Sequence, residues 1–450
     1  MKRRLFALFV LLLVASVDRV SAQTEPVRLT LDEAVSRGLA ASDRLEELSA
    51  RQESARAVQE QRRAAGRPQL AARGSYIRIN HVQEFTLPSA VPGVRLLIYP
   101  DLPNNLQTGV DLQWPIYTAG RVSALTRAAG AEVEAAGQDR DAARADLKLE
   151  ITRSFWAVIT AKAAADVVRH ALDRTNAHLI DVRNQLAVGL VPPSDVLTIE
   201  AQQAHQRTLS IESDNIVEST SAEFRRLVGL DPEAPFELAA ALGTARPGTP
   251  VPPAETSLPT FGAAFDLARA NRAERKALQF RINAASERVN AAAAAGLPTI
   301  SALGGYDFAR PNREIFPVRE AWQSSWRLGV HVRWSFFDGG RVHAETAEAV
   351  AARRGMEARL REFDGLVRVE IRQRMADLSS AQASIEAAQA GVRAATEARR
   401  VLAERFNSGV ATNTDVLNAQ VTLLQAELDL TRALANVQLA GARLDRAVGR

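Results

Sequence analysis

Two short segments of the chain alternate strictly between apolar and polar residues, which predicts strands with one apolar face. In residues 326–336 the apolar positions are Trp326, Leu328, Val330, Val332, Trp334 and Phe336. Residues 106–116 show the same alternation and also carry a tryptophan, Trp114. Weaker alternation at 69–79 and 299–309 predicts a partner strand for each of these two segments. We therefore expect four strands.

Long segments without proline, rich in Ala, Leu, Arg, Glu and Gln, predict helices. The two longest, 121–188 and 341–406, would each extend about 100 Å at 1.5 Å per residue. Soluble globular domains rarely contain helices of that length. Shorter helices are predicted at four further places: 30–66, 194–229, 260–296 and 414–449.

The same order of elements occurs twice, because the chain contains an internal duplication. Residues 230 positions apart match first: Thr30 and Thr260, Gly66 and Gly296, Tyr76 and Tyr306. Residues 220 positions apart match later: Gly109 and Gly329, Gly189 and Gly409, Asp195 and Asp415. The difference of ten residues falls between positions 76 and 109, which predicts an exposed loop there. We assign a first repeat to 23–230, a proline-rich linker to 231–259 and a second repeat to 260–450.

Residues 1–22 have the pattern of a signal peptide. Lys2, Arg3 and Arg4 precede an apolar run at 5–17, and small residues suitable for cleavage follow at 20–22. This run is too short to cross a bilayer, which needs about 20 residues. The chain has a formal net charge of +4, most of which lies within this segment. The net charge therefore does not indicate nucleic-acid binding. The absence of cysteine excludes disulfides, cysteine zinc sites and a lipid anchor on a cysteine.

The strand pattern fits a membrane β-barrel better than a soluble sheet, although a buried core remains the alternative. Trp326 and Trp334 are separated by about 26 Å along a strand, and outer-membrane barrels have an apolar band of about 25 Å between aromatic girdles. We therefore expect a girdle and a polar lumen face, formed respectively by Trp114, Trp326 and Trp334 and by Arg327, His331 and Arg333. Four strands cannot close a barrel and an open edge in lipid is costly, so several chains must share one barrel.

Together these features resemble the TolC-like family of outer-membrane efflux proteins over residues 25–450. The resemblance rests on the duplication, on the glycine turns between helices, and on residues 114–121 (WPIYTAGR) and 334–341 (WSFFDGGR), which lead into the long helices. It implies an α+β membrane protein that forms a homotrimer in the outer membrane of a Gram-negative bacterium. Its three chains would share a twelve-stranded β-barrel and a periplasmic twelve-helix α-barrel. The implied partners are outer-membrane lipid, a periplasmic adaptor protein and an inner-membrane pump, in drug or metal efflux or in type I secretion.

The resemblance extends to the turns that join the helices. Val188-Gly189-Leu190 matches the family's adaptor-docking tip motif, and Ser408-Gly409-Val410 is its second copy. Asp415, with Asp195 in the first repeat, matches an aspartate ring at the closed end of the family's tunnel. In the best-known members a second aspartate, an aromatic residue and an arginine complete this gate. The matching residues here are Asn418, Phe406 and Ala411. The glycines also suit helix ends, and the aspartates suit helix N-termini.

No motif in the sequence indicates an enzyme, a cofactor or a metal site. There is no glycine-rich phosphate loop and no nucleophile elbow. His170 and His178 lie about 12 Å apart on one helix, too far to share a metal ion. Asp338-Gly339-Gly340 fits a strand-to-helix corner better than a ligand loop. We expect a passive, gated export duct, with a periplasmic coiled-coil scaffold that conducts nothing as the alternative.

Overall fold

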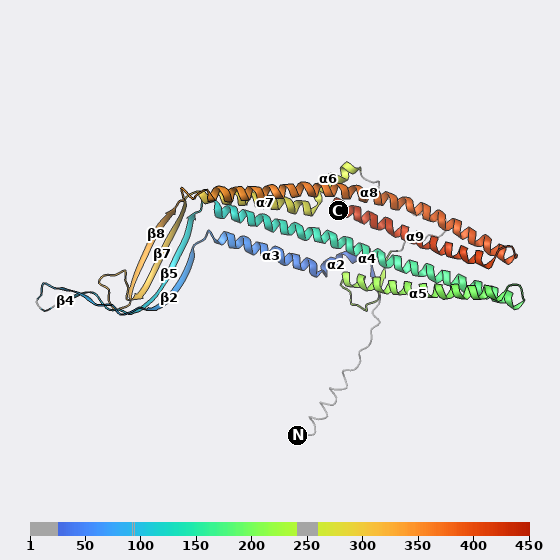
Figure 1. Ribbon diagram of the computed structural model, residues 1–450, viewed down its shortest axis with the longest axis horizontal. Coiled ribbons are helices and arrows are strands. Elements are labelled where there is room, and N and C mark those ends of the chain that lie inside the picture. The colour runs from blue at the N-terminus through green and yellow to red at the C-terminus, as the bar shows by residue number, and fades with distance from the viewer. Residues whose placement is uncertain (1–25, 92, 94, 241–259) are drawn as a thin grey trace, which may run out of the picture. The chain divides into compact units, whose positions relative to one another are not determined.

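A computed structural model describes residues 26–91, 93, 95–240 and 260–450 (Figure 1). The predicted signal peptide at 1–22 and residues 241–259 of the predicted linker lie outside the described residues. The chain divides into two compact units, each built from parts of both repeats. The helical unit contains the described residues of 26–43, 144–265 and 370–450, and the sheet unit contains those of 44–143 and 266–369.

Two very long helices, α4 (Arg121–Ala187) and α8 (Arg341–Asn407), contribute to both units and have 67 residues each. Each turns back into a shorter helix, α5 (Pro193–Leu227) or α9 (Asn413–Val448). The predicted bounds of these four helices agree with the structure to within a few residues. Among the described residues, none of the helices is both long enough and apolar enough to cross a membrane.

The single helices predicted at 30–66 and 260–296 are wrong, because each is interrupted. The first is split into α2 (Leu31–Ala40) and α3 (Asp43–Ala64), and the second into α6 (Phe261–Asn271), α7 (Ala273–Ala293) and the 3₁₀ turn η1 (Ala294–Gly296). Close packing accompanies the first break. A Cβ on Gly38 would lie 2.5 Å from the Ile151 side chain and 2.8 Å from the Leu227 carbonyl. Helix α2 is therefore held against α4 and α5.

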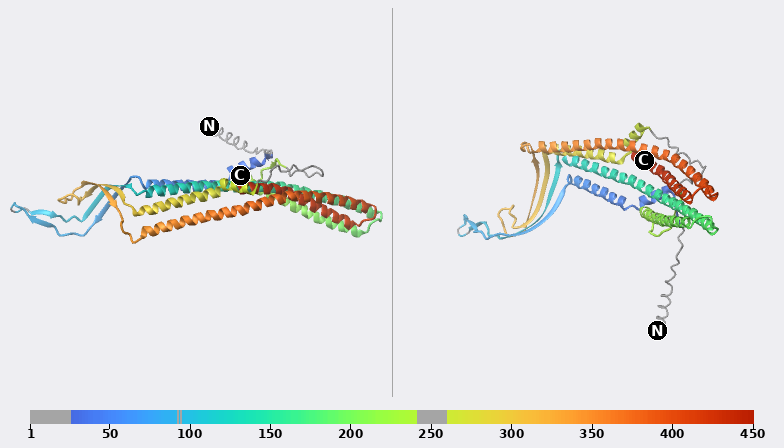
Figure 2. Two further views of the ribbon diagram at one scale, coloured as in Figure 1. Left: turned by 90° about the horizontal axis from the view of Figure 1, so that it is seen from above. Right: turned by 45° about the vertical axis from the view of Figure 1, so that its right-hand side comes forward.

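A four-stranded antiparallel sheet, in the order β2-β5-β7-β8, confirms the four predicted strands (Figures 1 and 2). Its members are β2 (Gln69–Arg78), β5 (Asn104–Tyr117), β7 (Thr299–Arg310) and β8 (Gln323–Arg333). The two repeats meet where β5 pairs with β7. The prediction that β8 includes 334–336 is wrong. Arg333 pairs with Thr299, the first residue of β7, so the next residues have no strand to pair with.

Two smaller pairs of strands complete the fold. The hairpin of β3 (Phe85–Pro88) and β4 (Arg95–Tyr99) lies between β2 and β5, in the region where the repeats are predicted to differ in length by ten residues (Figure 1). In the helical unit β1 (Val27–Leu29) pairs in parallel with β6 (Phe236–Leu238), so part of the predicted linker is a strand. The Phe236 ring lies 5.1 Å from the Phe224 ring of α5, which attaches β6 to the core.

The corners that lead from strand to long helix depend on left-handed backbone. Gly339 and Gly340 have φ of 68° and 86°, and Ala119 and Gly120 occupy the same places in the first repeat with φ of 51° and 81°. The Asp338 carboxylate then accepts from Val342 N and Gly340 N, which caps α8 and holds the pKa of Asp338 below its ordinary value. The proposed corner is thus confirmed.

Replacing Gly340 by alanine should destabilise the protein by about 1–2 kcal/mol per chain, because its φ is costly for any residue with a Cβ. Gly355→Ala is the matched control, since that glycine lies inside α8 with no atom within 4 Å of its Cβ position. The control should be neutral or more stable by up to about 1 kcal/mol. Thermal unfolding followed by circular dichroism in detergent, at one protein concentration, measures both. Equal melting temperatures for the two variants would contradict the assignment.

Candidate functional site

One face of the sheet is apolar on all four strands, which we call the apolar face. The register aligns Trp326 with Tyr306 and Tyr306 with Val110, and in the next row it aligns Leu328 with Gly304 and Leu112. The same face includes Leu70, Tyr76, Trp114, Phe308, Val330 and Val332. Trp326 and Leu328 are 75% and 73% exposed in the single chain.

This exposure argues against a core buried within the chain. Burial of apolar surface stabilises a protein by about 25 cal/mol per Å², yet within the described residues this apolar face remains uncovered. Contiguous apolar patches of this kind mark surfaces that contact lipid or another protein. The apolar face is therefore a candidate membrane surface.

The aromatic residues of the apolar face lie at different levels along the strands. Trp326 pairs with Tyr306 near the end of β8 that follows the β7–β8 connection. Trp114 lies four residues nearer the helices, in the row of Val330. Trp334 lies beyond β8, where its indole N–H donates to Gly296 O at 3.3 Å. Sequence reasoning missed Trp322, which stacks on Phe308 at 4.9 Å, because residues 311–322 have no periodicity.

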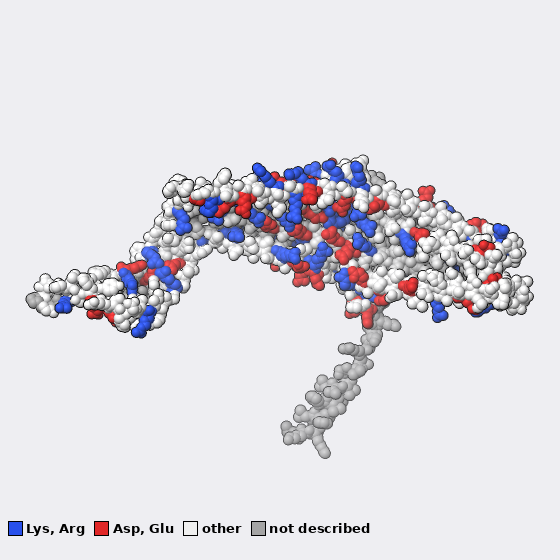
Figure 3. Space-filling model, viewed as in Figure 1, with Lys and Arg blue, Asp and Glu red and all other residues white. Residues whose placement is uncertain are grey.

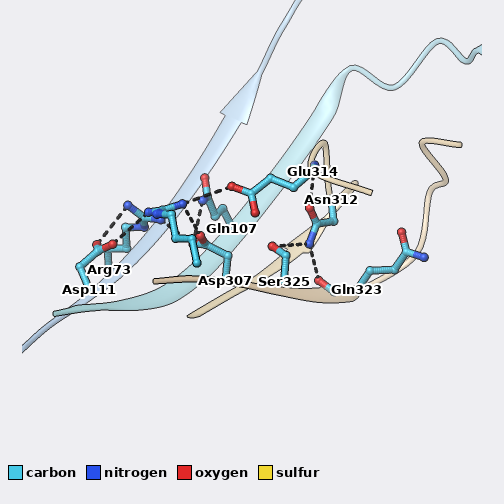
Figure 4. A network of polar contacts seen from close by, with 9 residues as sticks. Arg73, Gln107, Asp111, Asp307, Asn312, Glu314, Gln323 and Ser325 are labelled. Atoms are coloured by element: carbon cyan, nitrogen blue, oxygen red, sulfur yellow. Dashed lines mark hydrogen bonds and ion pairs between the residues drawn. The ribbon is translucent and has the colours of Figure 1, made fainter. Parts of the chain in front are cut away.

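The opposite, polar face carries a network of ion pairs that joins all four strands and a loop (Figure 4). The Arg327 guanidinium of β8 contacts Asp111 of β5 at 3.1 Å, Asp307 of β7 at 2.9 Å and Glu314 at 3.2 Å. Arg73 of β2 also pairs with Asp111 and Asp307. Of the predicted lumen residues, Arg327 is central to this network, and His331 and Arg333 are exposed on the same face.

Asp307 is the centre of this network, since its side chain is only 5% exposed and lies between two arginines. Gln107 also donates to it, at 3.0 Å. Two glycines leave room for the side chains of Asp307 and Arg327. A Cβ on Gly109 would lie 2.6 Å from an Asp307 carboxylate oxygen, and one on Gly305 would lie 3.0 Å from Nε of Arg327. Sequence reasoning missed Arg73, Asp111 and Asp307, because only the register between strands brings them together.

Both predicted tips form the same type of turn. At the first tip Gly189 has φ of 75° and Leu190 N donates to Gln185 O; at the second, Gly409 has φ of 72° and Val410 N donates to Arg405 O. These bonds form the Schellman motif that ends a helix. The apolar tip residues Val188, Leu190 and Val410 are 70%, 75% and 66% exposed. Ser408 is exposed as well.

The predicted gate residues of the second tip lie at the start of α9. The Asp415 carboxylate accepts from the Thr412 hydroxyl at 2.7 Å and from Thr412 N at 2.9 Å, which completes a capping box. These bonds lower the pKa of Asp415, the hydroxyl contributing most. Asn418 is exposed three residues further on, on the same helix face. Asp195 is half-buried in the first turn of α5.

The two helical hairpins, α4–α5 and α8–α9, share an apolar core near their tips (Figure 2). Its buried members are Leu179, Val182, Val196, Ile199, Phe406, Val416 and Leu417, with Ala411 packed against them. Polar contacts cross this core. His178 contacts Asn413 at 2.9 Å, Asn413 donates to the Asp195 carbonyl at 3.2 Å, and Thr175 donates to Gln420 at 3.1 Å.

Charge elsewhere is mixed rather than segregated. On the face shown in Figure 3, acidic and basic side chains lie interspersed over the helices, as is typical of solvated helix surfaces. Among the described residues there is no cluster of three or more His, Asp or Glu side chains able to hold a metal ion.

Comparison with known proteins agrees with this geometry. The family model described as outer membrane efflux protein matches residues 34–230 and 264–450. Protein CyaE of Bordetella pertussis is 26% identical over 347 residues, 75% of this chain and 71% of that protein. Outer membrane protein TolC of Vibrio cholerae is 21% identical over 308 residues, 67% of each. The crystal structure of the outer membrane protein VceC from Vibrio cholerae has a TM-score of 0.74 at 20% identity, covering 93% of this chain and 96% of that one.

The matched segments fall within the two predicted repeats, and the fold agrees with that of solved outer-membrane channels. The TolC-like resemblance and the predicted location in the outer membrane of Gram-negative bacteria are thereby confirmed. The chain belongs to the outer membrane efflux protein family.

Proposed function

We propose that the chain is the export duct of a tripartite efflux pump or a type I secretion system, and that it acts as a homotrimer. The observation that carries this proposal is the sheet, which has one exposed apolar face and whose edges, β2 and β8, pair with no further strand in the described part of the chain. Within a bilayer each unsatisfied backbone group costs several kcal/mol, so these edges must pair with other chains. Three chains would supply twelve strands and a closed barrel whose polar face lines the lumen.

The helical tips support a partner in the periplasm. Leu190 and Val410 expose apolar side chains at the ends of two rigid turns. In many Schellman motifs the apolar residue that follows the glycine packs back onto the helix. Exposed here, both are free to contact the adaptor protein that the family resemblance implies. The inner-membrane pump would supply the energy, and the duct itself would be passive.

We place the gate at the same tips. Opening requires the two hairpins to separate, and their shared core is held by His178–Asn413 and by the bond from Asn413 to the Asp195 carbonyl. Because the Asn413 amide nitrogen donates to Asp195, its oxygen faces His178 and accepts from the imidazole. Asn413 is 4% exposed, so separation of the hairpins breaks both of its hydrogen bonds to α4 and α5 as well as the Thr175–Gln420 bond. Asp415 and Asn418 would line the closed end of the tunnel.

The mature chain should be a trimer in detergent. After reconstitution into planar bilayers it should conduct ions. Membrane fractionation and native mass measurement test the assembly, and current recordings test the channel. A monomer in detergent, or a mature protein found entirely in the soluble fraction, would reject the duct. The second result would favour the coiled-coil scaffold.

Asn413→Ala should raise the open probability about tenfold, because loss of a buried hydrogen bond weakens the closed state by about 1–3 kcal/mol. Thr422→Ala is the control, since Thr422 is exposed on the same helix and bonds only to its own helix. The control should leave gating unchanged. Single-channel recording distinguishes them, and equal open probabilities in both variants would show that Asn413 is no part of the gate.

Acid should loosen the start of α9 but not the start of α5. Since the pKa of Asp415 is lowered in the folded chain, the stabilisation by its carboxylate is present above the unfolded value of about 3.9 and is lost as the pH falls through the folded value. Helix α5 has Pro192 at this position, without a side-chain cap. Hydrogen exchange of peptides from the two helix starts measures the difference. Asp415→Asn should remove the pH dependence, and an identical response of both starts would contradict the role of the cap.

A further inference from the structure

Residues 311–314 lie on the polar face of the sheet rather than extending beyond its end (Figure 4). Asn312 is 2% exposed, and its amide donates to Gln323 O and to Ser325 Oγ of β8, both at 3.0 Å. Its side-chain oxygen accepts from Glu314 N at 2.9 Å, which fixes the turn. The segment is thus attached to the sheet through a buried side chain.

Two charged residues of the same segment reach further across the polar face. The Arg313 guanidinium donates to Asn105 of β5 at 3.0 Å, and the Glu314 carboxylate accepts from Arg327 of β8 at 3.2 Å. The segment therefore contacts both β5 and β8.

Burial along β7 shows that this segment covers the sheet. Asp307 and Ala309 point to the polar face and are 3% and 7% exposed, whereas Leu303, further along that face, is 43% exposed. A cavity of about 330 Å³ remains beneath the segment, lined by Ile77, Gln107, Asp307, Ala309, Asn312 and Glu314.

We propose that residues 311–314 form a strap across the lumen side of the outer end of the barrel, where they set the conductance and ion preference of the duct. This proposal rests on the proposed function, because it takes the polar face as the lumen. Three copies of the strap would narrow the outer mouth. The strap lies on the sheet, so its effect on conductance would be separate from that of the helical tips.

The charges near the strap predict the direction of the ion preference. Arg73 and Arg327 pair with Asp111, Asp307 and Glu314, and Arg313 lines the same cavity as Asp307 and Glu314, so three positive and three negative charges balance. Removing the Glu314 charge leaves a surplus of one positive charge per chain. The reversal potential in a salt gradient should then shift toward anions.

The contacts of Glu314 and of Asn312 hold the strap with different strength. Glu314 and Arg327 are each 49% exposed, so their ion pair contributes little, whereas Asn312 is buried and makes three hydrogen bonds. Glu320 of the same loop provides a matched control. It pairs with Arg310 at 2.9 Å, and Arg310 projects to the apolar side of the sheet, opposite Leu106.

The test uses the absence of native cysteine. In an Ala309→Cys background, a water-soluble maleimide reports whether the strap covers the sheet. Glu314→Gln should speed labelling roughly two- to fivefold, the range for an exposed ion pair, and Asn312→Ala should speed it about tenfold or more. Glu320→Gln should leave the rate unchanged. The same variants, without the cysteine, are then recorded in planar bilayers for conductance and reversal potential.

Faster labelling together with larger conductance and an anion shift in Glu314→Gln supports the strap. If the protein conducts but all variants match Glu320→Gln in labelling and current, the strap is overturned while the duct stands. If labelling responds but the unsubstituted trimer carries no current, the duct fails and the role of the strap in conduction fails with it.

Discussion

An apolar sheet face that the described part of the chain does not cover is the constraint on which the rest of the structure depends. It cannot remain in water without cost, and its edges at β2 and β8 cannot remain unpaired in lipid. In the proposed duct, several chains together close the sheet edges, and the opposite face then surrounds the lumen. The ion pairs among Arg73, Asp307 and Arg327 fit this arrangement, because both arginines stay partly exposed to water while they neutralise the buried Asp307 carboxylate.

The two repeats form the same elements, but different residues stabilise their corners, tips and helix starts. Both corners between strand and long helix need left-handed backbone, which the second repeat meets with Gly339 and the first with Ala119. Both tips use a glycine-ended helix, but only α9 begins with a side-chain capping box. The polar link between the hairpins is also asymmetric, since Asn413 of the second hairpin contacts both the His178 side chain and the Asp195 carbonyl of the first.

The sequence was sufficient for the features that depend on local periodicity. Alternation predicted all four strands, proline-free segments predicted α4 and α8, and the residues around Trp114 and Trp334 led to the correct family. It was insufficient where packing or register decides. The close packing of α2 at Gly38 against Ile151 depends on tertiary structure, and the polar network follows from pairing across β2, β5, β7 and β8. Neither leaves a periodic trace in the chain.

The claim that the apolar face contacts lipid while the polar face contacts water can be measured directly along β8. Single cysteines from Arg327 to Val332, introduced into the cysteine-free chain and spin-labelled, report collisions with oxygen in lipid and with a water-soluble nickel complex. The account predicts a period of two, with Leu328, Val330 and Val332 accessible to oxygen and Arg327, Gly329 and His331 accessible to nickel. Access of nickel to every position, or the absence of alternation, would contradict it.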